Sequence, residues 1–309
     1  MKKRRKRSSA EKEGIRLFLI ALPFLALVVL FAYLPLWGWR YAFYDYQAGF
    51  KLKDCDMVGF KWFKYLISNK TQVQETLRVL SNTFAISGLN ILTSFLPAIF
   101  AIFLGELEGR RFKKFVQVST TLPHFIGWVL VYSMAFAIFS YNNGVFNKVM
   151  ISLGLITRPV NWLASGHLIW LKMCVWSIWK NIGWNSIMYL AAMAGIDSSL
   201  YEAAAVDGAG RFKKIWHITI PGLMPTFYVL LLMAIANFLN NGMEQYFVFQ
   251  NALNQSGIEV LDLYVYNIGI GSGTIPLATV VSMMKSVVSL ILLFSINGLS
   301  KLFRGETII

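Results

Sequence analysis

The chain has 309 residues, of which 56% are hydrophobic and 14% are charged. A soluble domain is about 25% charged and a disordered segment has low hydrophobicity, so the composition excludes both a typical soluble enzyme and a disordered chain. The formal net charge is +14. Because most of the cations flank apolar runs, this charge indicates a membrane protein and not a nucleic-acid-binding protein.

Six apolar runs are long enough to cross a bilayer as helices, which takes about 20 residues each. The first run, residues 15–37, follows basic residues 2–7. It is longer than the apolar core of a secretory signal and has no small-residue cleavage site, so we expect it to remain as a span. Only helices are expected to cross the bilayer at this length, which predicts an all-α fold. The other runs are residues 82–104, 115–140, 168–195, 222–241 and 276–300.

The distribution of Lys and Arg orients these spans through the positive-inside rule. With a cytoplasmic N-terminus, the inner segments carry 17 of these residues and the outer segments carry 9. The first outer loop alone carries seven, which weakens the bias, whereas the short inner loops agree with it. We therefore predict a multi-pass protein with both termini in the cytoplasm. Its predicted parts are a basic tail at 1–14, a span at 15–37, an extracellular loop at 38–81, a five-helix core at 82–300 that includes a cytoplasmic loop at 196–221, and a tail at 301–309.

Residues that carry chemistry are scattered. No Asp or Glu lies in the middle of a predicted span, which argues against proton coupling, although sodium coupling through backbone carbonyls stays open. The chain lacks a Gly-x-x-x-x-Gly-Lys-[Ser/Thr] phosphate loop. Cys55 lies in a polar loop and Cys174 in an apolar run, which predicts no disulfide, and no metal-ligand spacing occurs. We therefore expect no catalytic residue, no bound cofactor and no metal site.

The segment between the fourth and fifth predicted spans is expected to form a cytoplasmic knob. Asp197 can cap a short helix that reaches through Ala205, and Gly208 permits a tight turn. A second, amphipathic helix is expected at 211–218, and Pro221 permits entry into the next span. Such a knob suits docking to a cytoplasmic partner and also suits contact with lipid headgroups. The residues alone leave both interpretations open.

The same segment resembles the EAA loop of binding-protein-dependent ABC importer permeases. That pattern is Glu-Ala-Ala, three residues, Gly, nine residues, Ile, any residue, Leu and Pro. Ile220 stands here in place of the family's Leu, which preserves size and polarity. Further stretches resemble the polysaccharide and oligosaccharide branch, which is related to maltose-type permeases, and the resemblance covers roughly residues 58–304. The stretches that carry it are residues 82–84, 122–126, 179–197, 202–221 and 242–266.

The resemblance implies a MetI-like permease core with cytoplasmic coupling helices, placed in a bacterial cytoplasmic membrane and in contact with its lipid. It implies a heterodimeric pore with a second, homologous permease, a cytosolic ABC ATPase dimer that uses ATP and Mg²⁺, and an extracellular solute-binding protein that delivers an oligosaccharide. Glu202 is expected to anchor the loop in an ATPase cleft, and Gly208 to permit the turn. The residues implied in ATPase coupling are Glu202, Ala203, Ala204, Asp207, Gly208, Arg211, Ile218 and Pro221.

Sugars are bound through aromatic faces and through amide or hydroxyl partners, and the fourth and fifth spans are rich in both. The Asn pairs at 181 and 185 and at 237 and 241 are four residues apart, so each pair is expected to share a helix face. Amides cost free energy in hydrocarbon unless they face protein or a wet cavity. Tryptophans also form interfacial belts and amides also join helices, which stay open as alternatives. The predicted substrate-pathway residues are Lys180, Asn181, Trp184, Asn185, Asn237 and Asn241.

Two charged features allow two interpretations each. A mid-span lysine such as Lys180 costs about 2.5–3.5 kcal/mol on insertion scales. We favour a structural bond from it to backbone carbonyls of a broken helix over recognition of an anionic sugar. The outer loop 242–275 carries acids that include Glu259 and Asp262 but no Lys or Arg. It either helps to form the surface that meets the binding protein or is an ordinary gate loop.

These observations predict an all-α permease subunit with six transmembrane helices, which moves oligosaccharides and is not itself an enzyme. The alternative is a stand-alone ion-coupled secondary carrier, which the EAA loop and the lack of mid-span carboxylates both disfavour. A membrane-bound enzyme is a third class, and no catalytic cluster supports it.

Overall fold

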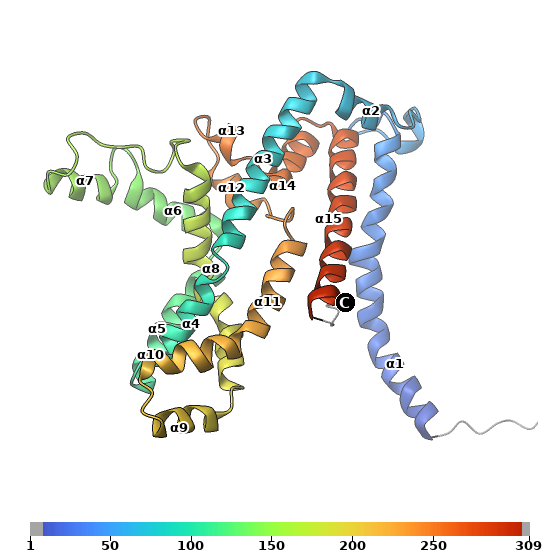
Figure 1. The fold of residues 1–309 in the computed structure, drawn as a ribbon. Helices are drawn as coiled ribbons and strands as arrows, with labels where there is room; N and C mark the ends of the chain where they lie inside the picture. Colours follow the sequence, from blue (N-terminus) through green and yellow to red (C-terminus); the bar gives the residue numbers. More distant parts are fainter. Residues whose placement is uncertain (1–8, 305–309) are drawn as a thin grey trace, which may run out of the picture. The chain divides into compact units, whose positions relative to one another are not determined.

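The computed structural model describes residues 9–304, and side-chain surroundings are described for residues 13–298. Within this part the chain is helical, and the only β-type pairing is an isolated bridge between Tyr44 and Met57. The chain divides into two compact units (Figure 1). One comprises Met1–Asn69 with Ile268–Met283, and the other comprises Lys70–Asn267 with Met284–Ile309.

Four helical stretches in the described part are long and apolar enough to cross a membrane, and a sharply bent helix pair gives a fifth if it is one span. The predicted fourth span is also a single helix, α8 (Ile169–Ala194), whose 26 residues extend about 39 Å. Its lysines and asparagines keep it less apolar than the others, so the six-span count stays a prediction. The four stretches are Glu13–Phe43, Lys70–Glu106, Arg211–Ala236 and Ile275–Gly298.

The first unit is built around one long apolar helix and a short outer helix. The long helix consists of α1 (Ser9–Val28), a π-helical turn η1 (Val29–Tyr33) and a 3₁₀ stretch η2 (Leu34–Phe43), so it extends six residues beyond the predicted end at 37. Its most apolar window is entirely unburied, as expected for a lipid-facing span. After a single 3₁₀ turn η3 (Leu52–Asp54), the outer helix α2 (Lys61–Ser68) packs against η2.

The segment 38–81, predicted as an extracellular loop, contains the start of a long helix. Helix α3 (Lys70–Leu92) begins twelve residues before the predicted start at 82, and α4 (Leu96–Glu106) follows after a break at 93–95. The polar first turns of α3 concealed the helix from a search for apolar runs. Pro97, in the first turn of α4, accounts for the break because proline cannot continue the hydrogen-bonded ladder of a preceding helix.

The predicted third span at 115–140 is wrong as a single helix. The chain forms α5 (Arg110–Phe125) and α6 (Trp128–Phe139), which are bent by 107° from one another. Pro123 lies in the last turn of α5, and Gly127 is extended and starts α6. A proline removes a ladder donor and crowds the preceding turn, so the helix ends here although the hydropathy continues.

The rest of the second unit alternates short outer and inner elements with two further long helices. In chain order the elements after α6 are α7 (Val145–Ser152), α8, α9 (Ser198–Val206), α10 (Arg211–Lys214), the π-helical turn η4 (Ile215–Thr219), α11 (Ile220–Ala236), α12 (Glu244–Phe249), α13 (Gln255–Ile258), α14 (Leu261–Tyr266), η5 (Asn267–Gly271) and α15 (Ile275–Arg304). Of the short elements, α13 packs against α3 and α8, α12 packs against α6 and α14, and α9 and α10 form the predicted coupling loop.

Helix α8 is the centre of this unit and packs against α3, α4, α5 and α11. The crossing with α5 is close because Gly183 has no side chain: a Cβ there would overlap the backbone of Thr120 and lie 2.7 Å from the Thr121 nitrogen. Small residues permit such close helix contacts in membranes. A second contact joins α4 to α8, where a Cβ on Gly105 would lie 2.6 Å from the Met193 methyl carbon.

Candidate functional site

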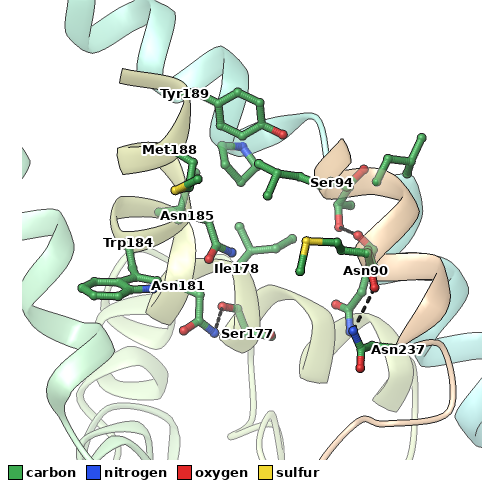
Figure 2. A pocket seen from close by; sticks show the side chains of 17 residues that line it. Asn90, Ser94, Ser177, Ile178, Asn181, Trp184, Asn185, Met188, Tyr189 and Asn237 are labelled. Carbon is green, nitrogen blue, oxygen red and sulfur yellow. Dashed lines mark hydrogen bonds between the residues drawn. The ribbon is translucent and has the colours of Figure 1, made fainter. Parts of the chain in front are cut away.

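A cavity of about 400 Å³ lies among α3, α4, α8 and α11 of the second unit. Figure 2 shows the asparagines of α8 on one side of it and Asn90 and Asn237 on the other. The residues described around it include no acidic or basic side chain. The chemistry of the cavity is therefore that of neutral hydrogen-bonding groups set in an apolar wall. Its polar lining consists of Asn90, Thr93, Ser94, Ser177, Asn181, Asn185, Tyr189 and Asn237.

Four of the six predicted substrate-pathway residues line this cavity, and two do not. Asn181, Trp184 and Asn185 reach it from consecutive turns of α8. Asn237 reaches it from the end of α11. Lys180 and Asn241, the remaining two, do not line it and bond elsewhere.

A hydrogen-bonded chain orients the aromatic end of the cavity. The Asn181 amide nitrogen donates to the Ser177 carbonyl at 3.0 Å, which leaves its Oδ1 facing the His124 Nδ1 at 2.9 Å. Because that oxygen can only accept, Nδ1 is the donor in this contact. The His124 ring stacks on Trp184 with centroids 4.5 Å apart and planes within 1°. Sequence reasoning passed over His124 because nothing in the sequence links it to Asn181.

Lys180 has the structural contact that we favoured. Its ammonium donates to the His124 backbone carbonyl at 2.6 Å, and it lies 5.4 Å from the Trp128 ring centroid. The last carbonyls of a helix have no intrahelical partner, and His124 lies in the last turn of α5, before the bend at Ile126 and Gly127. The side chain is 7% exposed. Lys180 therefore caps a broken helix and does not present its charge to the cavity.

The predicted shared face of Asn237 and Asn241 is wrong because α11 ends at Ala236. Asn237 caps the helix end, where its amide nitrogen donates to the Met233 carbonyl at 2.9 Å. Asn241 lies beyond a turn and accepts from the Ser87 hydroxyl at 3.0 Å. Asn237, Asn240, Asn241 and Gly242 follow the apolar residues of α11, so this polar stretch was an available signal of the end of the helix.

The sequence analysis missed the contribution of α3 and the break after it. Asn90, Thr93 and Ser94 line the cavity opposite α8. Asn90 and Ser94 are four residues apart, the same spacing that singled out the pairs on α8. That spacing was therefore an available signal on the second span.

The predicted coupling loop begins with a capped helix and a sharp turn. Helix α9 is capped by Asp197, whose carboxylate accepts from the Ser199 backbone N–H at 2.9 Å. That hydrogen bond lowers the pKa of the exposed Asp197 carboxyl below its ordinary value. Gly208 has a φ of +72°, a conformation that only glycine adopts readily. Glu202 lies exposed on α9 between the cap and this turn.

The predicted second helix of the loop, at 211–218, is present and is continuous with the next span. Residues 211–214 form α10, which continues through the π-helical turn η4 into α11, so one helical stretch runs from Arg211 to Ala236. Pro221 would crowd the carbonyl four residues before it in a regular α-helix. The wider turn directly before it adds a residue and relieves that crowding. The fifth span therefore begins eleven residues earlier than predicted.

Three contacts tie the loop to the long helices. The Tyr201 hydroxyl lies 3.0 Å from the Thr219 hydroxyl, and Ile196 packs so closely on α11 that a Cβ at Gly222 would lie 2.6 Å from its Cδ1. Arg211 forms an ion pair with Glu108 at the α4–α5 junction. The knob is therefore attached at both of its ends and is not a free loop.

The acidic outer segment is held inside the second unit. The Glu259 side chain is 6% exposed and accepts from Arg78 at 2.7 Å and from Asn267 at 2.7 Å. Asp262 forms an ion pair with Lys285 and accepts from the Gly242 backbone N–H at 2.9 Å. Both carboxylates are used internally, so they are not the acidic docking surface that we considered for the outer loop.

The chain is similar to known proteins in three comparisons: with a family model, with sequence relatives and with solved structures. The family model described as "Binding-protein-dependent transport system inner membrane component" matches residues 94–304. The chain is 38% identical to protein LplB of Bacillus subtilis (strain 168) over 96% of this chain and 92% of that protein. It is 36% identical to the polygalacturonan/rhamnogalacturonan transport system permease protein YteP of the same strain, over 94% and 89%.

A solved structure is similar over nearly the whole chain. It comes from a bacterial ABC transporter involved in the import of the acidic polysaccharide alginate, with a TM-score of 0.82 and 29% identity over 95% of this chain and 97% of that chain. A second structure of such a transporter, in complex with an alginate pentasaccharide-bound periplasmic protein, gives a TM-score of 0.83 at 29% identity, over 96% and 97%.

Proposed function

The chain belongs to the family of inner membrane components of binding-protein-dependent transport systems, and we propose that it is the permease subunit of an ABC importer for oligosaccharides. The observation that carries the substrate class is the cavity between α3, α4, α8 and α11, with its four asparagines and the exposed ring of Trp184. Amides pair with sugar hydroxyls as donors and acceptors, and an aromatic face packs on the apolar face of a sugar ring.

Within this proposal the cavity recognises hydroxyl groups and not charge. Its described lining has no cation, and the Lys180 ammonium donates to the His124 carbonyl at the end of α5. The relatives include a permease for polygalacturonan and rhamnogalacturonan and one for trehalose and maltose, so acidic and neutral oligosaccharides are both to be tested. Replacement of Lys180 by Met is expected to lower the uptake of both to the same extent. A selective loss of acidic substrates would assign charge recognition to Lys180.

The energy source in the proposal is a cytosolic ABC ATPase dimer that binds ATP and Mg²⁺. Glu202 on the exposed face of α9 docks in the ATPase, and the attached loop passes the motion of the ATPase to α8 and α11. A ligand shifts alternating access only through its different affinity for two states. The contacts of Tyr201 and Ile196 supply the physical link. Replacement of Tyr201 by Phe is expected to lower uptake while the ATPase still co-purifies, because it removes the link and leaves the docking face.

The remaining partners follow from the same proposal. A second, homologous permease completes the pore, and an extracellular solute-binding protein delivers the sugar. The chain lies in a bacterial cytoplasmic membrane with both termini in the cytoplasm, in the six-span arrangement, and it carries no ATPase site of its own.

The experiment that tests the proposal combines co-purification with uptake. The chain is purified gently from its native membrane, and the proteins that accompany it are identified by mass spectrometry. An ATPase and a second permease in comparable amounts are expected. A chain that purifies alone, and whose transport is independent of ATP, would overturn the importer in favour of an ion-coupled carrier.

Uptake of labelled acidic and neutral oligosaccharides then tests the cavity. Replacement of Trp184 by Ala is expected to reduce uptake at least about tenfold, because one aromatic platform contributes roughly 1 kcal/mol or more. Trp179 is the matched control: it lies on the same helix, is similarly exposed and does not line the cavity. Equal losses for both variants would refute this location of the sugar.

A further inference from the structure

Two copies of one short basic sequence occur 100 residues apart. Residues 111–114 and 211–214 both read Arg-Phe-Lys-Lys, and a glycine stands shortly before each copy. Each copy lies in the first turn of a helix, α5 or α10. The first copy begins the bent helix pair α5–α6, and the second begins the candidate span Arg211–Ala236, so each copy stands at the start of an apolar helical stretch.

The fold brings the two copies together. Arg211 of the second copy forms an ion pair with Glu108, which lies three residues before Arg111 of the first. In Figure 1, α10 lies beside the junction of α4 and α5. Two segments that are distant in sequence thus form one surface, which we call the RFKK surface and define as residues 110–114 and 211–214.

Most of the charge on this surface has no partner within the chain. Among the residues that the structure describes, no carboxylate forms an ion pair with Arg110, Arg111 or any of the surface's four lysines. Cations in the first turn of a helix also oppose the helix dipole. The first turn of α5 contains Arg110, Arg111 and Lys113 and no acid. A bound anion would offset this arrangement.

An exposed aromatic ring accompanies the cations in each copy. Phe112 is 56% exposed and Phe212 is 89% exposed. An apolar ring beside lysines and arginines at the end of a span fits the interface between headgroups and acyl chains. The docking face that we assign to the ATPase lies on α9, which carries Glu202 and ends at Val206, 88% exposed. Of the coupling residues that the resemblance implies, only Arg211 belongs to the RFKK surface.

We propose that the RFKK surface binds the phosphate headgroups of anionic phospholipids, with Phe112 and Phe212 inserted among the acyl chains. Clusters of four to eight cations directly beside a span have the composition of such sites. The lipid would hold the α4–α5 junction and the start of the fifth span at one depth, directly next to the coupling loop. The inference rests on the membrane placement in the proposed function, but its test requires no transport.

The test uses the full chain, purified in detergent with added phosphatidylglycerol or phosphatidylcholine, and counts retained lipids by native mass spectrometry. One variant replaces an exposed lysine in each copy, Lys114→Gln with Lys213→Gln. The control removes the same charge elsewhere, Lys51→Gln with Lys53→Gln, in an exposed outer loop. Wild type is expected to prefer phosphatidylglycerol. The first variant is expected to lose roughly tenfold in affinity for it, and the control to lose little.

Two further measurements decide between partners. Phe212→Ala keeps every charge and is expected to weaken phosphatidylglycerol retention, whereas inorganic phosphate alone is expected not to compete. Equal losses in the Lys114/Lys213 and Lys51/Lys53 variants, or full competition by inorganic phosphate, would overturn the proposal. Loss of the co-purifying ATPase with unchanged lipid retention would overturn it too, because the surface would then serve the ATPase.

Discussion

Replacement of Gly183 by Ala tests whether α5 and α8 meet as closely as the structure shows. A Cβ at this position would overlap the Thr120 backbone and lie 2.7 Å from the Thr121 nitrogen. Backbone atoms cannot rotate away, so the two helices must separate by more than about 1 Å to bring the closest Thr120 atom to an ordinary contact distance. Overpacking of this kind costs about 1–3 kcal/mol. Gly88 on α3 is the matched control, because a Cβ there would meet nothing within 4 Å.

The expected difference follows from two opposing terms. Alanine gains up to about 1 kcal/mol over glycine in a helix interior, and both variants receive this gain. Only Gly183→Ala also bears the overpacking cost, so it is expected to be about 2 kcal/mol less stable than Gly88→Ala. At about 2–4 °C per kcal/mol, the two apparent melting temperatures should differ by about 4–8 °C.

The assay is thermal unfolding in one detergent, followed by circular dichroism at one scan rate, because membrane proteins commonly unfold irreversibly. Gly183 lies between Ile182 and Trp184, which line the cavity, so Gly183→Ala should also lower oligosaccharide uptake. If Gly183→Ala melts at or above the temperature of Gly88→Ala, the close helix contact does not exist and the position of the cavity wall is wrong.

Two further predictions have equally matched controls. Glu259 and Glu75 both accept from Arg78, but the Glu259 side chain is 6% exposed and the Glu75 side chain is 48% exposed. In the same melting assay, Glu259→Gln should therefore lower the free energy of unfolding by about 3 kcal/mol and Glu75→Gln by under about 1 kcal/mol. Equal effects would refute the importance of burial. Gly208 has a φ of +72°, whereas Gly210 has a φ of −70°. Gly208→Ala should therefore strain the turn by about 1–2 kcal/mol and reduce the amount of ATPase that co-purifies with the chain. Gly210→Ala should leave the amount of co-purifying ATPase unchanged.

Local chemistry in the sequence predicted the coupling loop well. A side-chain cap and a left-handed turn depend on a few consecutive residues, so Asp197 and Gly208 indicated the start of α9 and the turn after it. The apolar runs likewise located most of the long helices. The bend after Phe125 was not predicted because no polar residue separates Phe125 from Trp128, whereas the end of α11 at Ala236 was missed although three asparagines and Gly242 follow it.

Pairings across long stretches of sequence were also out of reach. Lys285 lies within the predicted span 276–300, and the sequence did not indicate that it bonds Asp262. Glu259 was considered as part of an exposed surface, yet it bonds Arg78, 181 residues away. Each of these charged residues could pair with several groups or face solvent, and only the packing of α3, α14 and α15 determines its partner. The preference for a structural Lys180 succeeded for a different reason, since a buried cation without an acid nearby requires carbonyls.

The geometry gives α8 a specific place in the proposed transport cycle. Asn185 lines the cavity, and ten residues later the same helix ends at Gly195, where the coupling loop begins. Ten residues of helix span about 15 Å, and no proline or glycine interrupts them. A displacement of the loop that moves this end must therefore also move Asn185, unless α8 bends. Because Gly183 fixes α8 against α5 directly above, we expect α5 and α8 to move together, and α3 and α11 to form the opposite wall against which the cavity opens and closes.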